Sequence, residues 1–147
     1  MRPQTQGYTL IELMVALAIV CILSSVALPS YSAYLRRAAR TEGQMALALA
    51  MQAQERHYAQ NNTYRGFGGD GGGGDSVVWW SGRAPAASRY EIAAMPCDSQ
   101  SLQQCVLLTA TPGTARVDGR HRDPECGTLS LSSSGERLPR EPRTCWP

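Results

Sequence analysis

Residues 7–28 read GYTLIELMVALAIVCILSSVAL and form the most apolar stretch of a chain of 147 residues. The 21 residues from Tyr8 to Leu28 include one charged side chain, Glu12. As a helix they would rise about 31 Å, which matches the roughly 30 Å hydrocarbon core of a bilayer. The stretch has no polar face at helical spacing, as a helix of a soluble core would have. It predicts a helix that lies in a membrane or among similar helices.

The rest of the chain is balanced in composition. It is 43% hydrophobic and 18% charged overall, with a formal net charge of +2. These values exclude a long disordered chain and a strongly charged tail for nucleic acid. The length allows one domain, or one domain with an anchor, and the mean hydropathy of −0.27 excludes several membrane spans.

The apolar stretch is not an ordinary secretory signal. Such a signal has a basic segment before the apolar run and a small-residue cleavage site after it. Here the preceding segment has one basic residue, Arg2, and no such cleavage site follows Leu28. The small residue that offers a cleavage point, Gly7, precedes the apolar run.

The segment Gly7-Tyr8-Thr9-Leu10-Ile11-Glu12-Leu13-Met14 resembles the class III signal of type IV pilins and pseudopilins, with Tyr8 where the family usually has Phe. The resemblance implies that a membrane peptidase cuts between Gly7 and Tyr8 and methylates the new amino group of Tyr8. Residues 1–7 would be the leader peptide and residues 8–29 the transmembrane and filament-core helix. Residues 30–147 would form the periplasmic globular domain, which includes the second half of the helix.

Two residues of this helix have expected roles. A carboxylate inside a membrane costs roughly 2.5–3.5 kcal/mol at mid-helix and less near an end. Glu12 is therefore either an acid favoured by the helix N-terminus or, as the resemblance implies, the assembly partner of the Tyr8 amino group of a neighbouring subunit. Pro29 removes a backbone donor and is expected to kink or loosen the helix.

The helix is predicted to continue to about Asn61. Ala39, Gly43, Ala46 and residues at the same spacing give a small-residue face that suits close approach to a sheet. Charged and amide side chains are assigned to the solvent-facing sides, where Glu42 and Glu55 are expected to pair along the helix. These side chains are Arg36, Arg37, Arg40, Glu42, Gln44, Gln52, Glu55 and Arg56.

Three segments resemble minor pilins of Gram-negative bacteria more closely: residues 40–64, residues 105–112, and residues 126–131 with the closing Cys145-Trp146. The resemblance is weakest over residues 65–87, where glycines from Gly66 to Gly74 predict a flexible loop. The run lacks the lysine and the context of a phosphate-binding loop. Of Trp79 and Trp80, one is expected to fill the gap between helix and sheet.

Strand signals follow the loop. Four short strands are predicted over residues 89–93, 106–110, 115–117 and 128–131, with a turn at residues 132–135. One long helix followed by short strands indicates an α+β fold, in which a four-stranded antiparallel meander packs on the helix. The resemblance implies the same architecture, the type IV pilin fold with a disulfide-closed C-terminal region.

Five cysteines indicate export. Cys21 lies in the apolar span and is expected to be inert packing. The other four allow three connectivities. Cys97–Cys105 would close a short hairpin, and Cys126–Cys145 would close the tail as paired cysteines do in the family. Such bridges imply an oxidising compartment.

The sequence offers no candidate catalytic group, so we expect no enzyme, no cofactor and no metal. His57 and His121 are isolated, and no C-x-x-C spacing occurs. Asp118, Asp123 and Glu125 could form a carboxylate cluster, but arginines interleave with them, which favours a solvated charged loop.

The predicted function is that of a structural subunit of a type IV pilus, a minor pilin that serves adhesion, twitching motility or DNA uptake. The implied partners are other pilin subunits, the prepilin peptidase and methylase, and the inner-membrane assembly machinery. The chain would cross the inner membrane once, with a periplasmic C-terminal domain, before it enters the surface pilus.

Two alternatives stay open. A type II secretion pseudopilin is disfavoured by the disulfide-closed C-terminus. A DNA-uptake receptor would bind phosphates through arginines of residues 115–147, which carry six arginines and five acids for a net charge of +1, with Trp79 or Trp80 stacking. The candidate DNA contacts are Arg116, Arg120, Arg122, Arg137, Arg140 and Arg143.

Overall fold

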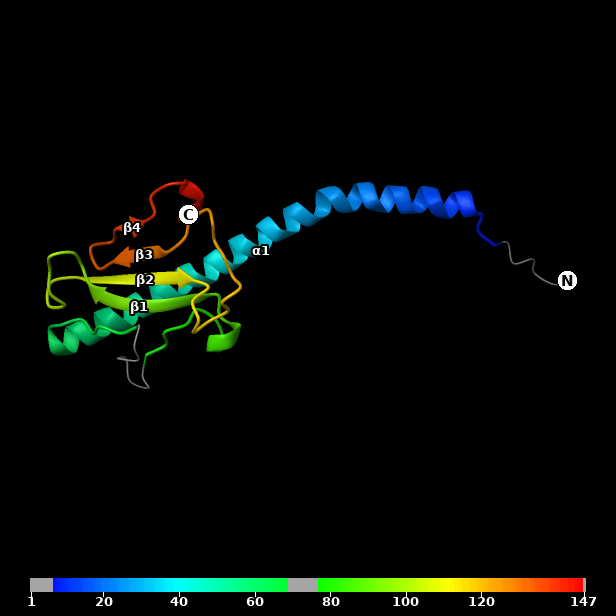
Figure 1. Ribbon diagram of the computed structural model, residues 1–147. Coiled ribbons are helices and arrows are strands. Elements are labelled where there is room, and N and C mark those ends of the chain that lie inside the picture. Colours follow the sequence, from blue (N-terminus) through cyan, green and yellow to red (C-terminus); the bar gives the residue numbers. More distant parts are fainter. Residues whose placement is uncertain (1–6, 69–76, 147) are drawn as a thin grey trace. The chain divides into compact units, whose positions relative to one another are not determined.

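The computed structural model describes residues 7–68 and 77–146, and the backbone alone for residues 28–30. Met1 to Gln6 of the expected leader and most of the glycine-rich run lie outside the described residues. The chain divides into two compact units, residues 1–37 and 38–147. The domain boundary expected from the sequence, at residue 29 or 30 where the apolar run ends, stays a prediction. One helix, α1 (Leu10–Asn61), contributes residues to both units (Figure 1).

The first unit is a bare apolar helix. Helix α1 is long and apolar enough to cross a membrane, with a mean hydropathy of 2.6 over its most apolar 18-residue window, and none of that window is buried. Thr9 starts the helix, since its hydroxyl accepts a hydrogen bond from the Glu12 amide at 3.3 Å. Helical structure continues through Pro29. The expected loosening at Pro29 stays a prediction.

In the second unit, residues 38–61 of α1 turn one face to the core. Ala39 and Leu47 are fully buried. Between them a side-chain carbon added to Gly43 would lie 3.1 Å from the Tyr90 ring, so the small-residue face is confirmed as a close contact with the sheet. Leu47 joins this buried face, whereas Met45 and Leu49 are exposed.

The sheet is a four-stranded antiparallel meander in the order β1-β2-β3-β4 (Figure 1), as predicted. The strands are β1 (Tyr90–Pro96), β2 (Val106–Pro112), β3 (Leu129–Ser132) and β4 (Arg137–Leu138). Ile92, Ala110 and Leu129 align across β1, β2 and β3 and are fully buried, so alternate residues of these strands form the core.

One predicted strand is wrong. Residues 115–117 form a turn, and the fourth strand is instead the exposed pair Arg137 and Leu138 after the predicted turn. At the end of β2, Gly113 has a φ of +62°, a conformation suited to glycine, and the chain turns away from the sheet. Val117 then bonds to the carbonyl of Thr114 and Asp118 to that of Ser88, so neither amide is free for a strand ladder.

The structure contains two disulfides, Cys97–Cys105 and Cys126–Cys145, the pairing that the sequence analysis favoured. The first joins the residue after β1 to the residue before β2, and the second joins Cys126, three residues before β3, to the tail. Cys21 is free and exposed on α1. Both bridges therefore close segments of the second unit.

Candidate functional site

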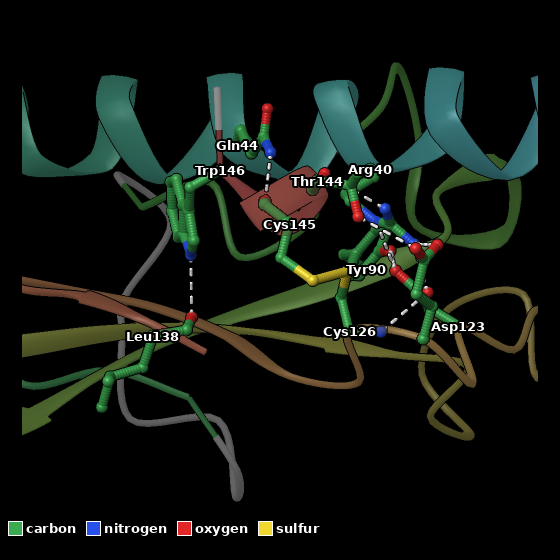
Figure 2. Close-up of a disulfide and its surroundings, with 10 residues drawn as sticks. Arg40, Gln44, Tyr90, Asp123, Cys126, Leu138, Thr144, Cys145 and Trp146 are labelled. Carbon is green, nitrogen blue, oxygen red and sulfur yellow. Dashed lines mark hydrogen bonds and ion pairs between the residues drawn. A yellow bond between two sulfur atoms is a disulfide. The ribbon is translucent and has the colours of Figure 1, made fainter. Parts of the chain in front are cut away.

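A buried ion pair joins α1 to the C-terminal segments (Figure 2). The Arg40 guanidinium binds both oxygens of Asp123, Nη2 to Oδ1 at 2.7 Å and Nε to Oδ2 at 2.9 Å. Nη2 also donates to Glu125 Oε2 at 2.9 Å. Nη1 donates to the carbonyl of Thr144 at 3.3 Å. We call this cluster, with Gln44, Tyr90, Cys126 and Cys145, the Arg40 junction.

Neighbouring groups satisfy the charges of the Arg40 junction. Tyr90 donates to Asp123 Oδ2 at 2.9 Å, and the Cys126 amide donates to Asp123 Oδ1 at 3.2 Å. Burial raises the pKa of the Asp123 carboxyl, but these bonds and the Arg40 guanidinium outweigh it, so the net pKa is lowered. The hydrogen bond to Asp123 raises the pKa of Arg40, and burial together with the same carboxylate raises the pKa of Tyr90. The pair is therefore charged at neutral pH.

The tail is held by the next turn of α1. Gln44 Nε2 donates to the carbonyl of Cys145 at 2.6 Å, and Cys145 is disulfide-bonded to Cys126 (Figure 2). Thr144 donates to Glu125 at 2.9 Å, and the Trp146 indole donates to the carbonyl of Leu138 at 3.0 Å. The tail therefore has polar contacts with α1, with residue 125 and with β4.

Two of the six candidate DNA arginines, Arg116 and Arg122, have side chains that bind other groups of the fold. Arg116 forms an ion pair with Glu91 at 2.7 Å and lies 4.0 Å above the centre of the Trp79 ring, so that face of Trp79 is covered. Arg122 Nη1 donates to the carbonyls of Gly119 and His121 at 2.7 and 2.8 Å, and more weakly to that of Gly113 at 3.4 Å. Arg122 therefore braces its own loop, residues 113–123.

The side chains of the other four arginines make fewer contacts. Arg140 pairs with Glu136 at 2.7 Å, and Arg137 lies 5.5 Å from the centre of the Trp146 ring. Among the residues that the structure describes, the side chains of Arg120 and Arg143 have no hydrogen bond or ion pair, and both are exposed. Of the six candidate arginines, these two have no described hydrogen bond or ion pair that binding an anion would break.

The solvated carboxylate loop expected from the sequence is wrong for Asp123, which is 5% exposed, and so is the solvent-facing position given to Arg40, which is 3% exposed. Glu42 and Glu55 were expected to pair with side chains along the helix; instead, Glu42 accepts a hydrogen bond from Ser81 and Glu55 accepts one from Tyr64. Sequence reasoning missed the Arg40 junction. The available signal was position, since Arg40 lies three residues before Gly43 and seven before Leu47 on the buried face.

The expected processing and assembly residues lie at the start of the first unit. Gly7 and Tyr8 precede α1, Tyr8 is exposed, and Glu12 is in the first turn of α1. Within the described part of the chain, no three His, Cys, Asp or Glu side chains are grouped as metal ligands.

Comparison with known families identifies two matching models that together cover most of the chain. Residues 2–28 match the prokaryotic N-terminal methylation motif. Residues 29–130 match the family described as "Type IV minor pilin ComP, DNA uptake sequence receptor". The two matches meet at residue 28, where the apolar run ends.

Individual pilins resemble the chain to different extents. The type IV major fimbrial protein FimA of Dichelobacter nodosus is 32% identical over 121 residues, or 79% of this chain and 73% of that protein. The type IV major pilin PilA of Myxococcus xanthus is 32% identical over 66 residues, 45% of this chain and 30% of its own length. Prepilin peptidase-dependent protein D of Escherichia coli is 54% identical over 37 residues, 25% of each chain. The chain thus spans less than a third of these last two relatives.

A solved type IV pilin from Shewanella oneidensis is 28% identical and overlaps 76% of this chain and 98% of its own, with a TM-score of 0.49.

Proposed function

Because the chain belongs to the type IV pilin family, whose members are structural subunits and not enzymes, we propose that it is a minor pilin that receives DNA at the surface of a type IV pilus. The observation that carries this proposal is the match of residues 29–130 to a minor pilin described as a DNA uptake sequence receptor. That description favours the DNA-uptake receptor, which the sequence analysis gave as an alternative to a purely structural minor pilin. A pilus subunit that binds no DNA is the remaining candidate.

The first unit supplies membrane insertion and assembly. The methylation motif over residues 2–28 supports a cut after Gly7 and methylation of Tyr8 by the prepilin peptidase and methylase. Before assembly the subunit would be anchored in the inner membrane with its second unit in the periplasm. It would then enter the fibre with other pilin subunits. Glu12, in the first turn of α1, would pair with the new amino group of a neighbouring subunit.

The second unit supplies the DNA contacts. Phosphate contacts by arginine dominate the affinity of proteins for duplex DNA. Arg120 and Arg143 are exposed without a described partner, so they need to break no existing contact to bind a phosphate. Arg137 and Arg140 would contribute less, because each already contacts a neighbouring side chain. Arg116 and Arg122 are withdrawn from the contact set, since both brace the fold.

The test is the salt dependence of DNA binding by the full processed chain in detergent. We expect the logarithm of the affinity for duplex DNA to fall linearly with the logarithm of the salt concentration. Replacing Arg120 and Arg143 by alanine should flatten the slope by about 0.9 for each phosphate that is no longer neutralised. The matched control is Arg56→Ala, which removes an exposed arginine of α1 and should leave the slope unchanged.

Equal slopes for the double variant and the wild type would contradict the assigned contacts. No binding at low salt, with both disulfides intact, would remove the receptor function and leave a pilus subunit without DNA binding.

A further inference from the structure

The two exposed arginines lie on segments that are far apart in the sequence and are held by the same buried side chain. Arg120 is three residues before Asp123, which binds Arg40 through both carboxylate oxygens. Arg143 is next to Thr144, whose carbonyl accepts a hydrogen bond from Nη1 of Arg40. Figure 2 shows the contacts of Arg40 with Asp123 and Thr144. Through them, one guanidinium holds the loop whose sequence includes Arg120 and the tail whose sequence includes Arg143.

We propose that Arg40 is the positioning residue of the DNA interface: it holds Arg120 and Arg143 in the arrangement in which both reach the phosphates of one duplex. Arg40 does not touch DNA itself, because it is 3% exposed and its guanidinium is occupied by Asp123, Glu125 and Thr144. This inference rests on the proposed function and adds a residue on α1 to it.

The chemistry of the contact suits a positioning role. An arginine presents a rigid planar fork that matches a carboxylate with two hydrogen bonds and keeps further donors for other acceptors. The fork of Arg40 uses those donors for a second carboxylate and a backbone carbonyl. A site fixed in this way before the ligand arrives loses less conformational entropy on binding.

The loop has its own internal support, which separates its position from its folding. Arg122 braces it through three carbonyls, and the His121 amide donates to the carbonyl of Asp118 at 3.0 Å. The Cys126–Cys145 bridge keeps its far end joined to the tail. Removing the hydrogen bonds of Arg40 is therefore expected to displace the loop and the tail from α1 without unfolding the loop.

Gln44 offers a graded variant. It holds the tail through the carbonyl of Cys145, and no hydrogen bond is described between it and residues 113–123. Arg40→Met should weaken the hold on both arginines, whereas Gln44→Met should weaken the hold on Arg143 alone. Methionine keeps the length of each side chain and removes its hydrogen bonds.

The experiment measures the salt slope of duplex DNA binding by the full processed chain in detergent, in three backgrounds: wild type, Arg40→Met and Gln44→Met. In each background Arg120→Ala and Arg143→Ala are added singly. In the wild type each alanine should flatten the slope by about 0.9. In the Arg40→Met background, the change in slope caused by each alanine should be at most half of its wild-type value. In the Gln44→Met background, only the change caused by Arg143→Ala should be smaller.

A purely structural role would not produce this selectivity, because general destabilisation changes the active fraction and not the slope of the folded molecules. Undiminished alanine effects in Arg40→Met would overturn the inference while the proposed function stands. If Arg40→Met does not fold, an undiminished effect of Arg143→Ala in Gln44→Met overturns it. A wild type that does not bind DNA overturns both the inference and the proposed function.

Discussion

The two units of this chain differ in how the roles of their residues are determined. In residues 7–37 most of the described side chains are exposed, and the expected roles of Gly7, Tyr8 and Glu12 follow from their order along the chain. In residues 38–147 residues of one type acquire different roles through the fold: Arg40 is buried, Arg122 braces a loop and Arg120 is exposed. A short signal can therefore be recognised in sequence, whereas an arginine must be placed before its role is known.

The largest expected effect concerns the first unit. Gly7→Glu should abolish cleavage, because the processing site needs a small residue on a flexible backbone before Tyr8. The protein should stay at precursor mass in the inner membrane, as measured by intact-mass analysis. The wild type should begin at Tyr8, and a mature chain that begins after Leu28 would contradict the assignment of the first unit.

Glu12→Val should be inserted and cleaved but poorly incorporated into fibres, since it removes the carboxylate expected to pair with the Tyr8 amino group. We expect at least a tenfold lower recovery in sheared fibres from cells without a wild-type copy. Thr9→Val is the matched control, because it removes a polar group of the same region and leaves the carboxylate in place. Normal recovery of Glu12→Val would exclude the charge pairing.

A large stability effect is expected at the Arg40 junction. Arg40→Met leaves the buried Asp123 carboxylate without its ion partner, and removing one member of a buried pair costs about 3 kcal/mol. Denaturant unfolding of a fragment that begins at Ser30 measures this destabilisation. Arg56→Met, an exposed substitution on the same helix, should change the free energy of unfolding by less than about 0.5 kcal/mol. Equal stabilities for the two variants would contradict the description of the junction.

A smaller effect should appear in acid. The pKa of Asp123 is lower in the folded chain than the ordinary value near 3.8, so its ionised form stabilises the fold above that pH. This contribution should decrease progressively as the pH falls below about 4. Asp123→Asn should flatten the stability profile between pH 5 and pH 2, whereas Asp98→Asn, an exposed substitution, should keep the wild-type profile. An unchanged profile in Asp123→Asn would contradict the lowered pKa.

Most of the fold was predictable from the sequence, because its signals are periodic. The continuous helix to Asn61 and the strands over residues 90–96, 106–112 and 129–132 follow from apolar spacing. The strand Arg137–Leu138 was missed because both side chains are exposed and it lasts only two residues. Val117 suggested a strand because it is apolar. It is indeed buried, but it lies in a turn that follows Gly113, whose φ is positive.

The candidate site was less predictable, because it depends on contacts between distant residues. Arg40 and Asp123 are 83 positions apart, and no local pattern joins them. Arg116, Arg120 and Arg122 are alike in sequence, yet the fold engages the side chains of Arg116 and Arg122 and leaves that of Arg120 without a described partner. The sequence shows six arginines near the C-terminus but does not distinguish their roles. The structure separates the arginines that brace the fold from those that are available to bind a phosphate.

The DNA interface is tested most directly by hydrogen exchange of the full processed chain in detergent, with and without duplex DNA. We expect DNA to slow exchange at residues 118–122 and 142–146, and residues 10–27 of α1 to exchange equally in both states. The slower exchange in the two C-terminal segments should disappear at high salt, since phosphate contacts are screened there. Unchanged exchange in both C-terminal segments, under conditions where DNA is bound, would contradict the assignment of Arg120 and Arg143 as its contacts.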